Sequence, residues 1–211
     1  MELQQRLPTA NLAPATEIAI WIMLSTGCRV GEISQARWAD VDLEQGQWVI
    51  PAGHSKNARE LTVFLSDFSL QQFKDLKTAT GDSAWCLPAR DRKKHIGLKT
   101  IAKQIRDRIR TEPLAHRTQA TGTLLLSGGE WTPHDLRRTA ATLMGELGVI
   151  GEIIERCLNH VEPNRLKRTY QRQERKDEQR DAWRRLGERL ALLQSASENE
   201  NVIVGRFSQS A

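Results

Sequence analysis

The sequence predicts a mainly α-helical protein with a small antiparallel β-sheet near its front. Most of the chain repeats apolar residues at helical spacing. Two short segments, 47–50 and 61–65, are instead rich in the β-branched and aromatic residues that strands favour. A polar stretch containing Pro51, Gly53 and Asn57 separates them, which is typical of a turn. The two segments are therefore expected to pair.

The predicted helices follow the apolar periodicity. Residues 16–25 are nearly all apolar, so this first helix is expected to be buried, and Gly27 beyond it suits a helix stop. Ser66 suits the N-cap of a later helix. A short third strand is expected at 85–87 and a long loop at 110–130. In chain order, helices are predicted over residues 16–25, 30–38, 66–77, 98–109, 133–147, 151–158, 165–172 and 178–193.

Length and composition indicate one soluble globular domain. A chain of 211 residues with 39% hydrophobic and 27% charged residues can bury one good core. We expect a lead-in over residues 1–15, the domain itself over 16–194 and a polar tail over 195–211. The formal net charge of +5 suits a nucleic-acid partner but does not require one.

Cysteine spacing and hydropathy indicate a cytoplasmic location. The three cysteines lie far apart and form no CxxC pair, which favours reduced thiols. The N-terminus has no signal-peptide pattern. The longest apolar stretch, residues 18–24, is too short to span a bilayer, so no membrane partner is expected.

Two segments place basic residues at predicted helix starts. Arg29 follows the first helix, and Glu32 lies three residues on, where it can hold the guanidinium; an ordinary surface ion pair is the alternative. Pro133 suits a first helical position, so His134 and Arg137 lie one turn apart, near a helix end where phosphate binds well. A capped amphipathic helix with a basic rim explains this segment equally well.

Three further residues have ordinary structural explanations when taken singly. Lys56 lies on the turn between the predicted strands, where a lysine is normally just solvated. His160 follows an apolar helix, where a core or capping role is common. Tyr170 is the only tyrosine of the chain, and its basic neighbours are typical of a solvated helix face.

Together these residues resemble a known family. The pattern consists of Thr-Gly-x-Arg-x-x-Glu at 26–32, Lys56, His-x-Leu-Arg at 134–137, Leu-Asn-His at 158–160 and Tyr170. In this order it is similar to the signature of the tyrosine recombinases, and most similar to integrases of prophages and genomic islands. The resemblance covers residues 16–193. Asn159 stands where glycine is commoner in that family, and Arg138 where histidine is common.

The resemblance implies the DNA breaking-rejoining fold and site-specific recombination through a 3′-phosphotyrosyl intermediate, with no metal or other cofactor. Tyr170 is the implied nucleophile and Lys56 the acid for the leaving 5′ oxygen. Arg29 and Arg137 clamp the phosphate oxygens. The implied catalytic set is Arg29, Lys56, His134, Arg137, His160 and Tyr170, with Glu32 in support.

The resemblance also implies partners. They are double-stranded attachment-site DNA and further copies of the chain, assembled as a tetramer, and an accessory DNA-bending protein is compatible with this. Residues 183–193 or 202–204 are expected either to pass to a neighbouring copy or to pack on their own domain. Relatives usually carry a separate helical domain first, so the chain is expected to be a fragment of a longer integrase. The expected DNA contacts are Lys99, Lys103, Arg106 and Arg138.

Three other functions compete with this interpretation. A metal-dependent nuclease would use Asp40, Asp42 and Glu44, but no second acidic cluster accompanies them, and His54, His95 and His116 show no zinc spacing. A non-catalytic DNA-binding regulator would be expected to have lost a catalytic position, whereas all six are occupied. A type IB topoisomerase shares the chemistry, and only an assay of strand exchange against relaxation separates it.

Overall fold

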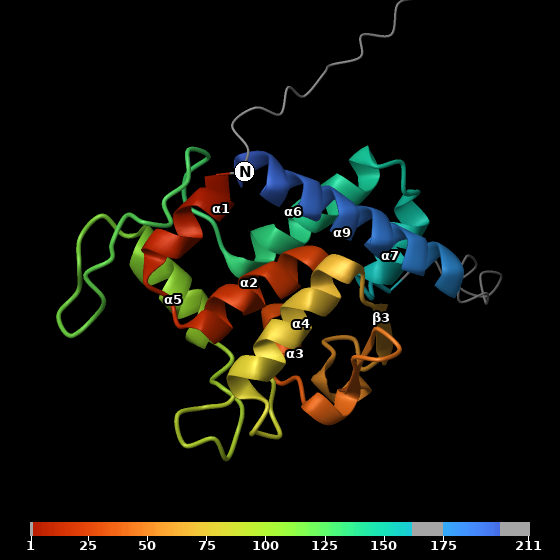
Figure 1. Cartoon of the computed structure of the whole chain (residues 1–211), viewed down its shortest axis with the longest axis horizontal. Coiled ribbons are helices and arrows are strands. Elements are labelled where there is room, and N and C mark those ends of the chain that lie inside the picture. The colour runs from red at the N-terminus through yellow and green to blue at the C-terminus, as the bar shows by residue number, and fades with distance from the viewer. Residues whose placement is uncertain (1, 162–174, 199–211) are drawn as a thin grey trace, which may run out of the picture.

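The computed structural model describes residues 2–161 and 175–198, and Figure 1 shows their arrangement. The predicted helix at 165–172, with Tyr170, and the segment 202–204 lie outside the described residues. The α-helices are α1 (Glu2–Arg6), α2 (Pro14–Thr26), α3 (Val30–Ser34), α4 (Asp67–Thr80), α5 (Thr100–Ile109), α6 (Pro133–Glu146), α7 (Gly151–Cys157) and α9 (Lys176–Glu198). Short 3-10 helices are η1 (Leu7–Ala10), η2 (Trp38–Asp40) and η3 (Ala52–His54).

The sheet is small and antiparallel, so the predicted fold class is confirmed. Its strands are β1 (Val41–Asp42), β2 (Gln47–Ile50) and β3 (Leu61–Phe64), in the order β1-β2-β3. Trp48 pairs with Val63 in the register of β2 and β3, and both side chains are buried.

The third strand predicted at 85–87 is wrong. Trp85 makes only an isolated bridge to Arg37. Cys86 and Leu87 are buried in a loop, so their apolar character reflects burial and not strand pairing. The same loop explains why the helix predicted at 30–38 ends at Ser34. The backbone N–H of Cys86 donates to the carbonyl of Ala36, so this part of the chain leaves the helix to bond the loop.

The core is built around α2, whose residues from Ala19 to Thr26 are all buried. Helices α4, α6 and α9 pack against it, and Figure 1 shows α2 lying centrally beneath α6 and α9. Trp183 of α9 is fully buried and its Nε1 donates to the carbonyl of Thr26 at 3.0 Å. This bond satisfies one of the carbonyls that a helix end leaves free.

The first residues belong to the core rather than to a lead-in. Leu3, Leu7 and Ala10 are buried in the same apolar cluster as α2. Arg108 of α5 is also buried, with Nε donating to the carbonyl of Ala10 and Nη2 to that of Asn11, each at 2.6 Å. The buried cation therefore binds the end of η1.

The three cysteines are buried in the core, and no described helix suits a membrane span. The three cysteines are free and buried, and burial raises the pKa of each thiol, that of Cys28 to about 12. Thiols with raised pKa react weakly. Within residues 2–161 and 175–198, no helix is long and apolar enough to cross a membrane.

Candidate active site

Arg29 is held at the turn between α2 and α3. Gly27 ends α2 in the left-handed conformation, with φ of 69°, and a Cβ there would press on Leu158. Arg29 is the N-cap of α3: its backbone N–H donates to Oε2 of Glu32 at 2.7 Å, and its Nη1 contacts Oε1 at 2.9 Å. The predicted ion pair is confirmed. It is not an ordinary surface pair, because the Glu32 side chain is only 2% exposed.

Arg137 joins two other parts of the site. Its side chain is buried, with Nη1 donating to the carbonyl of Gly27 at 2.5 Å and Nη2 donating to the carbonyl of Leu158. Burial lowers the pKa of Arg137 to about 10, and the charge of Arg29 contributes in the same direction. The charge of the buried Glu32 acts in the opposite direction, so this carboxylate partly offsets both guanidiniums.

Helix α6 begins with a capping box that fixes the position of Arg137. Pro133 is in the first turn, and Thr132 donates to Oδ2 of Asp135 from its backbone N–H at 2.9 Å and from its hydroxyl at 2.8 Å. These bonds lower the pKa of Asp135. His134 is exposed one turn before Arg137, as predicted, and Arg138 is exposed and pairs with Asp135 at 3.2 Å.

His160 follows the C-terminal end of α7. Its Nδ1 lies 2.6 Å from Oε2 of Glu155, and its backbone N–H donates to the Glu155 carbonyl at 2.9 Å. Glu155 therefore fixes the orientation of the His160 ring through Nδ1.

Lys56 is exposed on the connection between β2 and β3, and this connection contacts the turn that carries His160. Nδ2 of Asn159 donates to Oγ of Ser55 at 3.1 Å and to the carbonyl of Arg59 at 3.0 Å. Nδ2 of Asn57 donates to the carbonyl of Asn159. Sequence reasoning noted Asn159 only as a departure from the family pattern. Its signal was an asparagine directly after a helix, where a left-handed residue is common.

The described site residues thus converge from four segments. Hydrogen bonds connect the α2–α3 turn, the start of α6, the end of α7 and the β2–β3 connection, which carry Arg29, Arg137, His160 and Lys56 respectively. The structure does not bring Lys99, Lys103 and Arg106 to this site. All three are exposed on or beside α5, which Figure 1 shows on the opposite side from α7 and β3.

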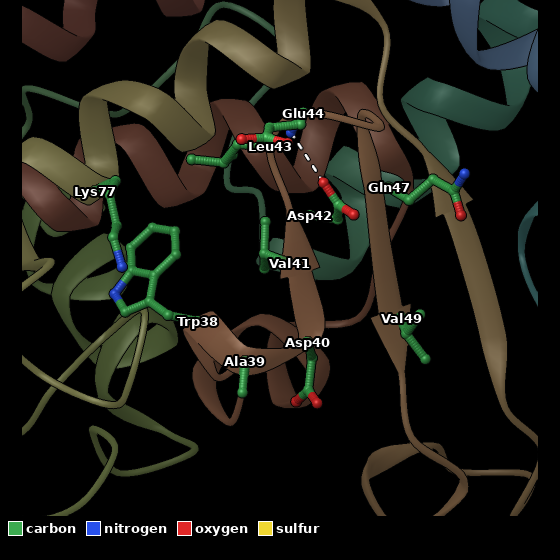
Figure 2. Close-up of a pocket in the computed structure, with 10 residues that line it drawn as sticks. All are labelled: Trp38, Ala39, Asp40, Val41, Asp42, Leu43, Glu44, Gln47, Val49 and Lys77. Atoms are coloured by element: carbon green, nitrogen blue, oxygen red, sulfur yellow. Dashed lines mark hydrogen bonds between the residues drawn. The ribbon is translucent and has the colours of Figure 1, made fainter.

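A shallow depression near β1 holds the acidic residues weighed as a metal site. Asp40 directly precedes β1 and Glu44 lies beyond its other end. Figure 2 shows the two carboxylates at opposite ends of the depression. Oδ1 of Asp42 accepts the backbone N–H groups of Glu44 and Gln45, which is a turn-forming role. No group of three His, Cys, Asp or Glu side chains suited to a metal occurs in the part of the chain that the structure describes.

Residues 2–177 match the phage integrase family. The chain therefore belongs to this family, and its fold is that of a tyrosine recombinase catalytic domain. The solved lambda integrase catalytic core superposes with a TM-score of 0.56 at 20% identity, covering 78% of this chain and 91% of that one. The crystal structure of XerA recombinase gives 0.61 at 19% identity, covering 92% and 62%.

Curated relatives agree with the family. The chain is 28% identical over 179 residues to prophage integrase IntA of Escherichia coli K12, covering 85% of this chain and 40% of that protein. It is 25% identical over 143 residues to tyrosine recombinase XerA of Thermococcus kodakarensis, covering 68% and 46%. The chain thus spans less than half the length of these relatives.

Proposed function

We propose that this domain cuts and rejoins DNA in site-specific recombination, with Tyr170 forming a 3′-phosphotyrosyl bond. The observation that carries the proposal is the pair Arg29 and Arg137. One is fixed by the buried Glu32, and the other is buried and fixed by two backbone carbonyls. Two guanidiniums that are each held in a fixed position can clamp the oxygens of one phosphate, which supports a phosphate as the ligand.

The residue types fit the chemistry of phosphoryl transfer. The Tyr170 oxygen attacks phosphorus, and the bond to the 5′ oxygen breaks. Extra negative charge develops on the non-bridging oxygens, where Arg29 and Arg137 bind bidentately and His160 donates a further hydrogen bond. Arginine is a permanent cation at neutral pH, which suits a clamp on a charged phosphate.

Proton transfers complete the step. Lys56 donates a proton to the leaving 5′ oxygen, and His134 assists removal of the proton from the Tyr170 hydroxyl or hydrogen-bonds the phosphate. One phosphodiester bond is replaced by one phosphotyrosyl bond. A 5′ hydroxyl can therefore reverse the reaction and reseal a strand without ATP.

The proposed partners are double-stranded DNA and further copies of the chain. Solved structures of lambda integrase include a dimer bound to a COC′ core site and a tetramer bound to a Holliday junction. We propose a tetramer on paired sites for this protein as well. Arg138, exposed next to Arg137 on α6, would contact a phosphate near the site, whereas Lys99, Lys103 and Arg106 would contact DNA elsewhere.

A covalent trap tests the proposal. The 211-residue protein is mixed with nicked duplexes whose sequence beside the nick is randomised, so that no attachment site need be known. Protein–DNA adducts are then recovered on a denaturing gel and sequenced. The expected result is an adduct enriched in one sequence and absent from Tyr170→Phe. No adduct, or an equal adduct from Tyr170→Phe, would contradict the proposal.

A second assay separates recombination from simple relaxation. The enriched sequence is placed twice in one supercoiled plasmid and once in another. Recombination predicts exchange between the paired copies. Relaxation of both plasmids without exchange would indicate a topoisomerase activity instead.

A further inference from the structure

The connection between β2 and β3 is tied to the end of α7 by side-chain amides. Asn159 donates from Nδ2 to Oγ of Ser55 and to the carbonyl of Arg59, and Asn57 donates from Nδ2 to the carbonyl of Asn159. These bonds flank Lys56 on both sides. Within the connection itself, the N–H of Ala58 donates to the Ser55 carbonyl at 3.1 Å, which is a local turn only.

Lys56 depends on these bonds for its position because its own surroundings are open. Lys56, Ala58, Arg59 and Glu60 are all exposed, whereas Ser55 is buried and Asn57 is half-buried. An exposed connection of this kind would otherwise sample many conformations. The two asparagines replace the missing apolar packing with directional bonds.

We propose that Asn159 is the positioning residue for Lys56: its amide holds the β2–β3 connection against the His160 turn before DNA arrives. The inference rests on the proposed function, since the position of Lys56 matters only where a 5′ oxygen leaves. Asn159 acts through Lys56 and contacts no reacting atom.

The conformation of Asn159 explains why an asparagine can take this part. Its φ is 50°, in the left-handed region that asparagine and glycine tolerate best among the common residues. Glycine would keep the turn after α7 and the position of His160, but it has no side-chain amide to donate. The side chain therefore adds a tether that glycine at this position lacks.

A loosened connection predicts a specific kinetic defect. Lys56 must lie within hydrogen-bond distance of the 5′ oxygen as the bond to phosphorus breaks. If the connection occupies this position for a smaller fraction of the time, the rate of the step falls in proportion to that fraction. Only protonation of the leaving 5′ oxygen is affected, whereas phosphate binding and activation of the Tyr170 hydroxyl are not.

The test compares two leaving groups in Asn159→Gly. The substrate is the nicked duplex recovered from the randomised pool, made once with the ordinary 5′ oxygen and once with sulfur at that bridging position. A thiolate leaves without a proton, because thiols are far more acidic than alcohols. Asn159→Gly removes both bonds donated by Nδ2, so we expect it to slow adduct formation roughly ten-fold with oxygen and to leave the sulfur substrate near the wild-type rate.

Two other variants serve as a control and as an independent test of the tether. Asn11→Gly is the matched control, because Asn11 also has a positive φ, of 47°, but lies between η1 and α2; it should change neither rate. Asn57→Ala removes the third bond from the other side, so it should reproduce the oxygen-specific defect. Equal slowing of both substrates by Asn159→Gly, or no slowing of either, would overturn the proposal.

Hydrogen exchange of the free protein provides a readout that needs no activity. The amide of Ala58 should exchange faster in Asn159→Gly than in the wild type, while amides of α7 stay unchanged. Unchanged exchange at Ala58 would overturn the tether. Faster exchange in a protein that forms no adduct would retain the tether but reject its catalytic purpose together with the proposed function.

Discussion

Arg137 is a buried cation whose hydrogen bonds go to backbone carbonyls of two segments far apart in the sequence. Burial lowers its pKa to about 10, with Arg29 contributing in the same direction. A cation whose folded-state pKa is lowered destabilises the free protein at neutral pH, and a bound phosphate offsets that effect. Arg137 therefore links the packing of the site to the ligand that it is proposed to bind.

Arg137→Lys keeps the charge but loses the fork that reaches both Gly27 and Leu158. We expect the rate of adduct formation to fall about 100-fold or more, the usual effect of removing a donor to a developing oxyanion. Arg184→Lys is the control, since Arg184 is exposed on α9 in ion pairs with Asp181 and Glu188. Rates for the two variants that agree within about two-fold would argue against a phosphate clamp.

Glu155 orients the His160 ring through Nδ1. Glu155→Gln keeps the size of the side chain but removes its charge, so the charge-assisted hydrogen bond that orients the His160 ring is lost. We expect adduct formation near pH 7 to slow about ten-fold, comparable to the loss of a charge-assisted hydrogen bond. A rate for Glu155→Gln that matches the wild type would contradict this role.

Helices α6 and α9 support the segments that carry the site. Helix α6 is held by its capping box at Thr132 and Asp135, and α9 packs on α2, α4, α6 and α7. Gly187 of α9 faces the Ser66 side chain, where a Cβ would overlap it. The close approach of α9 and α4 therefore requires glycine at this position.

The cap at Asp135 predicts a pH-dependent stability. Hydrogen bonds from the Thr132 hydroxyl and backbone N–H lower the pKa of Asp135, so the folded state binds fewer protons than the unfolded state. This stabilisation is complete above the ordinary aspartate pKa of about 4 and is lost as the pH falls through the lowered value. Asp135→Ala should reduce the free energy of unfolding by about 1 kcal/mol at neutral pH. Denaturant titrations that give the same difference in acid and at neutral pH would exclude this origin.

Gly187→Ala should move α9 away from α4. We expect the free energy of unfolding to fall by about 1–3 kcal/mol, the usual effect of overpacking. Gly145→Ala is the matched control, because a Cβ at this exposed position of α6 meets Ile154 only at 3.9 Å. Thermal melts that rank the two variants equally would show that α9 and α4 can separate without penalty.

The whole molecule presents basic residues on two faces. Under the proposed function, Arg29, Lys56 and Arg138 would contact DNA at the candidate site, whereas the exposed Lys99, Lys103 and Arg106 lie on or beside α5. Salt dependence distinguishes their contributions, because each phosphate that a basic side chain neutralises releases counterions.

Replacing Lys99, Lys103 and Arg106 with glutamine tests the α5 face. If these residues bind phosphates, the slope of log binding constant against log salt should become shallower by about 0.9 for each phosphate that is no longer neutralised. Binding to a fluorescent duplex at several salt concentrations measures it. An unchanged slope would remove α5 from the DNA interface.

Sequence reasoning succeeded where structure is decided by near neighbours. The Arg29–Glu32 pair, the α6 start at Pro133 and the Ser66 cap all depend on residues within one helical turn of each other. It failed where the partner is distant in the chain. The buried Arg108 donates a hydrogen bond to the carbonyl of Ala10, 98 residues away, and Asn159 donates one to Ser55, 104 residues away. The two-residue strand β1 is too short to have a period that a sequence can reveal.

The residue that becomes linked to DNA can be identified by mapping the covalent bond. The adduct is trimmed with nuclease and digested with trypsin, and the peptide that gains a nucleotide is identified by mass spectrometry. Arginines at 168 and 172 release a short peptide, residues 169–172, that contains Tyr170. We expect a 3′-phosphonucleotide on this peptide and on no other. A nucleotide on a different peptide, or a bond to a serine or cysteine, would contradict the assignment of Tyr170 as the nucleophile.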